Sequence, residues 1–502
     1  MRSELKISLP IKNLQELEKQ NNFKSKLAKL ATGFLEKYYG ANLLLDIPPA
    51  LYETDSKLFS AISTAEKLQA IGIIGKIIKS PKFYDEPFFH RFSITMQKMN
   101  LGSSGGDFFN EESALWKAIG EATERSLWKT NDHLLQNIQH LPYAKIKSKA
   151  LNIFKLAGFS EEQKKSCNWM NFDQNAVFGW IPAISLTGHA PHKNIFCPAQ
   201  LINSSYFNRN VKGTGIGNDK EPLLRHCITT GAATTSGPLE EAIVKGILEI
   251  IERDAYIISY LNKLSPPVLD FEHLSFQDED LEKVYKMFKR YGLEVYLVKL
   301  PTDFSASIVS AIILDRSGNG PAFAIGNSAK LDLKSAILGA LTEAFSIRMY
   351  LKKNWDIKKE SPLPDLKKFN MIDRMIYWAR PENMPRLDFM TQGEKIKLNL
   401  ETEENFFNTQ EKTDGEKYYK DKLQLLIKEL GDKKYEACYV ELSTPAVKKI
   451  GLRSVQVIIP ELQPMHLDEE LPYLGGKRLH EVPKKTGYLP AETLCQEPHP
   501  FS

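Results

Sequence analysis

The sequence lacks the features that mark secreted, membrane or disulfide-bonded proteins. Its five cysteines are odd in number and widely spread, without a CxxC pair, which favours free thiols and argues against a structural zinc site. No apolar run approaches the ~20 residues that a membrane-spanning helix needs. The N-terminus has no apolar signal core. We therefore expect a cytoplasmic protein with no membrane segment.

A strong charge of either sign is also absent, as is a phosphate-binding loop. The chain has 66 basic and 62 acidic residues among 502, a net charge of +4 that gives no reason to expect a nucleic-acid partner. No GxxxxGK[ST] motif occurs, and "GTGIGND" (213–219) lacks GxGxxG spacing, so we interpret it as a turn. His189, His192 and Cys197 are alternative metal ligands, but their Pro-rich spacing favours a loop that enters a strand.

What the chain does have is an alternation of short apolar strands and long amphipathic helices. The predicted helices span 111–130, 238–261, 278–291, 333–353 and 416–430. The predicted strands span 177–186, 194–202, 293–300, 307–315, 435–442 and 454–462. Residues 355–415 are polar and charged and are predicted to form an insertion.

One helix combines a core-facing stripe with a row of carboxylates. In "SGPLEEAIVKGILEIIERDAYIISYL" (236–261), isoleucines such as Ile243 and Ile247 share one side of the helical wheel. Glu241, Glu249 and Glu252 gather on the other side. A solvated acidic face would explain this pattern, because most helical glutamates only cover a surface. The alternative is that the carboxylates point at a bound metal ion.

The acidic pattern recurs, and the recurrence favours a metal site. The ExxER spacing of Glu249, Glu252 and Arg253 is repeated in 121–125, and a looser version pairs Glu343 with Arg348. Carboxylates three residues apart lie on one helix face, so each helix can offer two oxygens to a hard cation. Acidic helices meet only when a cation offsets their repulsion. Mg²⁺ shared with nucleotide phosphates meets this need.

Several segments together resemble the YcaO family. They are "SSGGDFFNEESALWKAIGEATER", "TTGAATTSGPLEEAIVKGILEIIERDA", "AIGNSAKLDLKSAILGALTEAFSIR", the stretch from "VELSTPAVKK" to "GGKRL", and the terminal "PHPFS". The resemblance extends from about residue 62 to the end. It implies an α+β fold of mostly antiparallel sheets flanked by long helices, preceded by an N-terminal helical extension (1–61). The ATP-binding catalytic domain would then span 62–502.

The resemblance also implies a chemistry. Azoline-forming members use ATP and Mg²⁺ to activate a peptide backbone amide after a Cys, Ser or Thr side chain has attacked it. The resulting oxygen is phosphorylated, and phosphate leaves as a thiazoline or oxazoline ring forms, as in bacteriocin biosynthesis. Charge develops on the transferred phosphoryl group, so the main catalytic task of the metal and the arginines is to stabilise that charge.

Roles then transfer by position. The expected Mg²⁺ ligands are Glu121, Glu124, Glu249, Glu252 and Glu343. The expected nucleotide-binding residues are Ser103, Ser104, Gly105, Gly106, Arg125, Glu241, Arg253, Glu343 and Arg348. The expected catalytic residues are Arg125, Arg253, Arg348, Pro498, Pro500 and Ser502. The stretch from Ser103 to Gly106 is predicted to be a turn whose backbone N–H groups approach a phosphate.

The C-terminal tail (487–502) bears on which reaction is expected. Azoline-forming members commonly end in PxPxP near the active site, whereas this chain ends in PHPFS with Ser502 in place of the last proline. Ser346 also replaces a glutamine that many members carry, and Gly237 stands where an asparagine often precedes the second acidic helix. The tail favours azoline formation over amidine or thioamide formation. A non-catalytic accessory or scaffold member, which binds nucleotide or nothing, is a further alternative.

Partners follow from the same resemblance. The substrate would be a ribosomally made precursor peptide. About 60 N-terminal residues are too few for an attached recognition domain, so a separate leader-peptide-binding protein is expected, with a flavin dehydrogenase as a further pathway partner. We also expect a homodimer. An unrelated Mg²⁺ enzyme of the prenyl-transferring type is disfavoured, because the DDxxD pattern of its acidic helices is absent.

Overall fold

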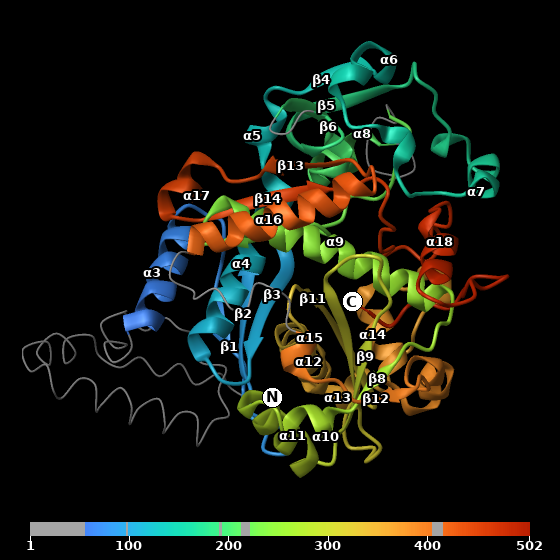
Figure 1. The fold of residues 1–502 in the computed structure, drawn as a ribbon. Coiled ribbons are helices and arrows are strands. Elements are labelled where there is room, and N and C mark those ends of the chain that lie inside the picture. The colour runs from blue at the N-terminus through green and yellow to red at the C-terminus, as the bar shows by residue number, and fades with distance from the viewer. Residues whose placement is uncertain (1–55, 97–98, 190–192, 212–220, 404–414, 502) are drawn as a thin grey trace, which may run out of the picture. The chain divides into compact units, whose positions relative to one another are not determined.

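The computed structural model describes residues 56–96, 99–189, 193–211, 221–403 and 415–501, in two compact units that meet in sequence at Ile119 and Gly120. Figure 1 shows their elements. Most of the predicted N-terminal extension (1–61) and the segment "GTGIGND" lie outside the described residues. Helix α3 (Ser56–Ala70) crosses residue 61, so the predicted domain division stays a prediction. No helix within the described ranges is long and apolar enough to cross a membrane.

The first unit is built on a small antiparallel sheet in the order β1–β2–β3. Its strands are β1 (Ile77–Lys79), β2 (His90–Met96) and β3 (Met99–Asp107). The predicted turn from Ser103 to Gly106 is wrong in conformation, because these residues form part of β3 and pair with β2. Gly105 is needed there, since a Cβ would lie 2.3 Å from the backbone nitrogen of Ala118 on the following helix. Ser-Ser-Gly-Gly suits turns locally, but pairing with β2 decides the outcome.

The second unit contains two larger sheets that are antiparallel apart from the β8–β12 pair. The first sheet has the order β4–β5–β13–β14–β7, with β6 also paired to β5. Its strands are β4 (Gln139–Pro142), β5 (Val177–Thr187), β6 (Asn194–Pro198), β7 (Ala232–Thr235), β13 (Ala437–Glu441) and β14 (Arg453–Ile458). The second sheet has the order β11–β10–β9–β8–β12. Its strands are β8 (Val268–Leu269), β9 (Glu294–Lys299), β10 (Ser307–Leu314), β11 (Phe323–Lys330) and β12 (Lys395–Ile396).

Long helices cover these sheets, which confirms the expected α+β fold. The main ones are α4 (Glu111–Thr130), α9 (Leu239–Leu261), α11 (Glu279–Arg290), α12 (Leu333–Lys352), α14 (Met371–Ala379) and α16 (Gly415–Asp432). The shorter ones are α5 (Asp132–Leu135), α6 (Tyr143–Ile146), α7 (Glu161–Ser166), α8 (Ser204–Asn210), α10 (Phe271–Ser275), α13 (Trp355–Lys358), α15 (Leu400–Glu403), α17 (Pro445–Ile450) and α18 (Arg478–Lys485). The five predicted helices and six predicted strands are all present, with ends that differ by a few residues.

Helix α9 is the element that both large sheets share. It packs on β7 and β14 of one sheet and on β11 of the other, and α16 lies along it (Figure 1). Its isoleucines, including Ile247 and Ile251 at 0% exposure, belong to the main core. Gly246 permits the close approach to β14, because a Cβ there would lie 2.7 Å from Val457. The predicted core-facing stripe of this helix is confirmed.

Candidate functional site

The carboxylates of α9 and α12 are held by the free edge of a sheet. Strand β11 is the edge strand of its sheet, so alternate N–H groups point away from β10. Two of them are used: Ala329 N donates to Glu252 Oε2 at 3.0 Å, and Asn327 N donates to Glu343 Oε2 at 2.7 Å. These residues are two apart, as donors on one edge must be. One strand edge therefore brings together carboxylates from two helices that are far apart in sequence.

Close packing makes this arrangement possible. Helix α12 lies on β11 and β10 (Figure 1). A Cβ at Gly326 would lie 2.1 Å from the backbone nitrogen of Ala344, and one at Gly339 would lie 2.3 Å from Ser328 Oγ. Glycines thus occupy both faces of the contact where the backbone of α12 approaches the strand. Gly339, four residues before Glu343, thus serves this packing.

Glu249 and Arg253 complete the α9 side of the site. Gly231 N donates to Glu249 Oε2 at 2.8 Å, and Arg253 Nη2 lies 3.3 Å from Glu249 Oε1. Arg253 Nη1 lies 3.2 Å from Glu252 Oε1. The Arg253 side chain is 11% exposed, so both ion pairs are largely removed from water. The guanidinium sits between two carboxylates of its own helix.

Helix α4 brings a further carboxylate close to this group. Burial, and then repulsion from Glu249 and Glu121, holds the pKa of Glu124 well above its usual value. Its neighbour Glu121 pairs with Arg125 at 2.5 Å. The predicted meeting of the three acidic helices is thus visible in the electrostatics. We call the set of Glu121, Glu124, Glu249, Glu252 and Glu343 the acidic cluster.

When all five carboxylates are ionised, the acidic cluster carries more negative charge than its arginines balance. Burial, and then the Glu252 carboxylate, raises the pKa of Glu343 to about 8. Burial also raises the pKa of Glu249, which Arg253 partly offsets and Glu252 reinforces. Five carboxylates face two arginines, Arg125 and Arg253, so a bound cation would stabilise the ionised cluster. Bound Mg²⁺ would offset this excess of negative charge.

Arg253 has spare donor capacity that suits an anion. Within the described residues, its buried Nε atom makes no hydrogen bond, and its buried Nη1 atom makes none beyond the ion-pair contact with Glu252. Leaving such donors unsatisfied is costly, which favours a ligand that accepts from them. Phosphate oxygens match a guanidinium in geometry and charge. Carboxylates together with an incompletely satisfied arginine therefore fit a nucleotide with its Mg²⁺ ion.

The residues present fit Mg²⁺ as a shared ion and not as an all-protein cage. Among the described residues, no three His, Cys, Asp or Glu side chains are arranged to hold a metal by themselves. Mg²⁺ normally takes one or two carboxylates and completes its shell with phosphate oxygens and water. One or two of Glu124, Glu249, Glu252 and Glu343 would hold each ion together with a nucleotide.

Other predicted site residues lie elsewhere or have other partners. Glu241 pairs with Lys245 at 2.7 Å and accepts a hydrogen bond from the Tyr419 hydroxyl of α16. Arg348 is 2% exposed and bonds Asp315 Oδ2 at 2.7 Å and the Pro321 carbonyl at 2.7 Å. Their assignments to a nucleotide stay predictions.

The C-terminal tail is folded into the protein as far as it is described. His499 and Phe501 are 0% and 1% exposed, and the Pro498 carbonyl accepts two hydrogen bonds. Pro500 is also buried, whereas Ser502 lies outside the described residues. Ser103 to Gly106 belong to the first unit, and their predicted role stays a prediction. Sequence reasoning missed Gly231, Asn327 and Ala329, because backbone donors leave no signature in side-chain patterns.

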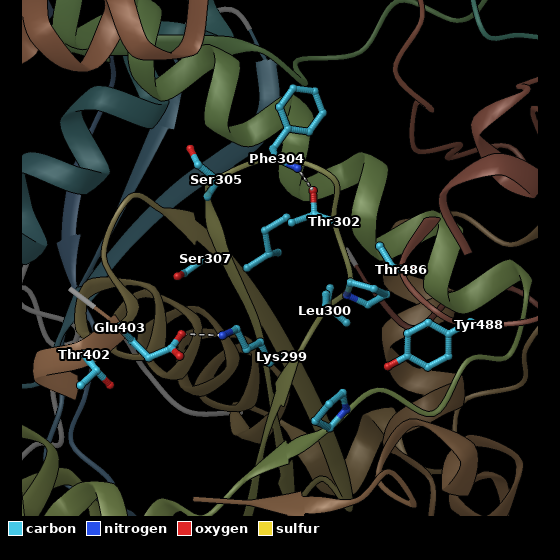
Figure 2. A pocket seen from close by; sticks show the side chains of 14 residues that line it. Lys299, Leu300, Thr302, Phe304, Ser305, Ser307, Thr402, Glu403, Thr486 and Tyr488 are labelled. Atoms are coloured by element: carbon cyan, nitrogen blue, oxygen red, sulfur yellow. Dashed lines mark hydrogen bonds and ion pairs between the residues drawn. The ribbon is translucent and has the colours of Figure 1, made fainter. Parts of the chain in front are cut away.

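A further cavity has a volume of about 450 Å³, and Figure 2 shows the side chains that line it. Its walls come from the β9–β10 connection, α15 and the segment after α18, with Thr302 and Tyr488 among them. Lys299 Nζ and Glu403 Oε2 pair at 2.6 Å on one wall. It shares no lining residue with the acidic cluster, so it is a separate feature of the surface.

Comparison with solved structures supports the fold. A heterocyclase solved in complex with substrate and cofactor has a TM-score of 0.67 at 20% identity, over 88% of this chain and 57% of that chain. This chain thus spans less than two thirds of that heterocyclase. A YcaO protein from Methanopyrus kandleri, bound with AMPPCP and Mg²⁺, has a TM-score of 0.52 at 16% identity, over 82% and 91% of the two chains. The Escherichia coli microcin synthetase McbBCD complex has a TM-score of 0.53 at 14% identity, over 77% of this chain and 88% of that chain.

Sequence comparison identifies the family. A protein of Methanothermobacter thermautotrophicus without an assigned function is 25% identical over 311 residues, which cover 59% of this chain and 69% of that protein. Residues 105–463 match the family model described as YcaO cyclodehydratase, which binds ATP and Mg²⁺. The match includes the whole acidic cluster and the strands that hold it. This chain belongs to the YcaO family, whose cofactors are ATP and Mg²⁺.

Proposed function

We propose that this protein is an ATP- and Mg²⁺-dependent enzyme that activates backbone amides of a ribosomally made precursor peptide. Cys, Ser or Thr side chains of that peptide would close into thiazoline or oxazoline rings. The observation that carries the proposal is the acidic cluster with Arg253 inside it. A surface patch of glutamates would not have raised pKa values, backbone donors or a buried arginine with unused N–H groups.

Each part of the site has a role in this chemistry. ATP supplies the phosphoryl group that turns the amide-derived oxygen into a leaving group. Glu124, Glu249, Glu252 and Glu343 would hold the metal. Hydrogen bonds from Gly231 and β11 fix the last three of these carboxylates before the nucleotide arrives. Arg253 donates to phosphoryl oxygens, on which charge develops as the phosphoryl group is transferred. The protein contributes positioning and charge more than covalent chemistry.

The tail favours azoline formation over the alternatives. Azoline-forming relatives commonly end in a proline-alternating tail near the active site, and here Phe501 lies against Arg253 of the acidic cluster. An amidine- or thioamide-forming activity, or a nucleotide-binding scaffold without catalysis, would not require the tail to be placed there. The buried tail therefore supports the azoline proposal, although this chain has Ser502 in place of the last proline.

Partner proteins are part of the proposal. A structural neighbour is the McbBCD microcin synthetase, a complex of several proteins, and another was solved with its substrate. We propose that a separate leader-peptide-binding protein presents the precursor, that a flavin dehydrogenase acts on the same peptide, and that the chain forms a homodimer. If the purified chain alone retains the precursor tightly in a pulldown, a separate recognition partner is not needed.

Calorimetric titration of ATP with Mg²⁺ tests the nucleotide site. The wild type is expected to bind with micromolar affinity, and the double variant Glu249→Gln, Glu252→Gln to lose detectable binding because two metal-facing charges are removed. Arg316→Met is a suitable control, since the Arg316 side chain is 61% exposed and its ion pair with Glu294 lies at the surface. Wild-type protein that binds no ATP, alone or with its partner, would overturn the proposal and support a scaffold that binds no nucleotide.

A further inference from the structure

The C-terminal segment 498–501 is anchored at its start by two hydrogen bonds. Tyr260 Oη of α9 donates to the Pro498 carbonyl at 2.9 Å, and Trp378 Nε1 of α14 donates to the same oxygen at 2.8 Å. The Pro498 carbonyl thus links α9 to α14, and α14 belongs to the segment 355–415 that was predicted to be a polar insertion. Pro498, at the start of segment 498–501, is fixed between these two helices.

Arg374 of α14 holds the rest of this segment. Its side chain has no exposed surface, and its Nη1 lies 3.2 Å from His499 Nε2 and 3.4 Å from the Phe501 carbonyl. Its Nη2 donates to the Leu467 carbonyl at 3.2 Å and pairs with the Glu469 carboxylate. An arginine buried this deeply is stable only with such partners. Arg374 therefore ties the chain terminus to the 467–469 loop.

The other end of the segment reaches the acidic cluster. The Cζ atom of Arg253 lies 4.2 Å from the ring centroid of Phe501, within cation–π distance. The Phe501 ring also packs on Tyr256, one turn further along α9, at 5.3 Å between centroids. Arg253 is thereby enclosed by Glu249 and Glu252 on one side and an aromatic face on another. The ring limits the orientations that the guanidinium can adopt.

We propose that Arg374 and Phe501 are positioning residues for Arg253. Arg374 fixes the terminal segment, and the segment presses the Phe501 ring against the guanidinium so that its unused N–H groups stay directed at the nucleotide. Neither residue touches the reacting atoms. The inference rests on the proposed function in assigning Arg253 to the nucleotide, but the placement of Arg253 itself can be tested without any ligand.

Phe501→Leu is the most informative variant, because it removes the aromatic face and keeps an apolar side chain of similar size. Its affinity for ATP with Mg²⁺ is expected to fall roughly three- to tenfold, the range of a cation–π contact. Arg374→Met should have an effect at least as large, since it frees the segment. Arg386→Met is the matched control: it removes an exposed pair with Glu497 in the same C-terminal region, and ATP affinity should not change.

A double-mutant cycle separates positioning from general damage. If Phe501 acts through Arg253, Phe501→Leu should weaken ATP binding in the wild type but hardly at all in an Arg253→Lys background. Additive effects of the two changes would overturn the proposal, as would an unchanged affinity of Phe501→Leu. A merely structural role of the ring predicts a lower melting temperature with additive effects.

A crystal structure of Phe501→Leu tests the positioning of Arg253 independently of the proposed function. The guanidinium of Arg253 is expected to leave its place between Glu249 and Glu252 or to occupy a second rotamer. If it stays in one unchanged position, the positioning role is wrong even when ATP binds. If the wild type binds no ATP, the proposed function fails, and this structure still decides whether the ring places Arg253.

Discussion

Helices α9 and α12 each fix a glutamate on the edge of β11, yet their arginines serve different ends. Arg253 follows Glu249 by four residues, which places it about 40° away on the helix, on the same face. Arg348 follows Glu343 by five residues and points about 140° away, where it pairs with Asp315. A one-residue change in spacing thus separates an arginine of the site from one that braces the fold.

The largest expected effect concerns the bracing arginine. Arg348→Met should lower the free energy of unfolding by about 3–5 kcal/mol, because Asp315 would be left buried without its counter-charge. Urea unfolding measures this loss. Arg316→Met, which removes an exposed pair with Glu294, should cost less than about 1 kcal/mol. Equal losses in the two variants would show that Arg348 does not brace the fold.

Glu221 lies outside the acidic cluster, so its pKa shows the effect of burial without repulsion from the cluster's carboxylates. Burial raises the pKa of Glu221 from 4.5 to about 7, although Tyr206, Gly179 and Gln200 donate to it. The folded state therefore prefers the protonated form, and this stability is complete below pH 4.5 and is lost as pH rises to about 7. The loss amounts to about 3 kcal/mol.

Glu221→Gln should remove this decline, which urea unfolding between pH 4.5 and 7 would show. ATP with Mg²⁺ should leave the Glu221 contribution unchanged, since no acidic neighbour contributes to its shift. An unaltered pH dependence in Glu221→Gln would contradict the assignment of this decline to Glu221.

The next prediction concerns the close contact between α12 and β11. Gly326→Ala places a Cβ 2.1 Å from the Ala344 nitrogen and 2.7 Å from the Ala340 carbonyl, so the helix must move off the strand. We expect a loss of about 1–3 kcal/mol in stability and weaker binding of ATP with Mg²⁺, as Glu343 is drawn from Asn327. Gly431→Ala in α16, with nothing within 4 Å, should be neutral or slightly stabilising.

The smallest expected effect tests the guanidinium of Arg253 itself. Arg253→Lys keeps the positive charge but loses the planar fork that matches phosphate oxygens. ATP affinity in calorimetry should fall about tenfold, equivalent to about 1.4 kcal/mol. An affinity equal to that of the wild type would mean that charge alone is needed and that α9 uses its arginine no differently from a lysine.

Much of the scaffold could be predicted from periodicity. The α9 stripe and the ends of α12 were predicted almost to the residue, because apolar side chains at helical spacing must face a core. Strand β11 was not predicted, since Gly326 and Asn327 are poor strand formers and only the close packing of α12 explains them. The edge donors of the site follow from that strand and were therefore missed with it.

The role of segment 355–415 could not be predicted from its polarity. This segment supplies α14, and its Arg374 and Trp378 are 0% and 1% exposed against the C-terminal tail. A charged residue in a polar stretch normally predicts a surface. Its burial depends on a chain terminus more than a hundred residues later, which no local pattern encodes. The same holds for Pro498 and His499, whose Pro-rich context predicts a frayed end.

The outer edge of β11 also determines what this sheet can recruit. Exposed strand edges invite another strand, in aggregation as well as in peptide capture. Here Glu252 and Glu343 occupy donors that an added strand would need. Any peptide that extended this edge would have to displace the carboxylates that we assign to the metal. The same two hydrogen bonds that shape the nucleotide site therefore also protect the sheet from unwanted pairing.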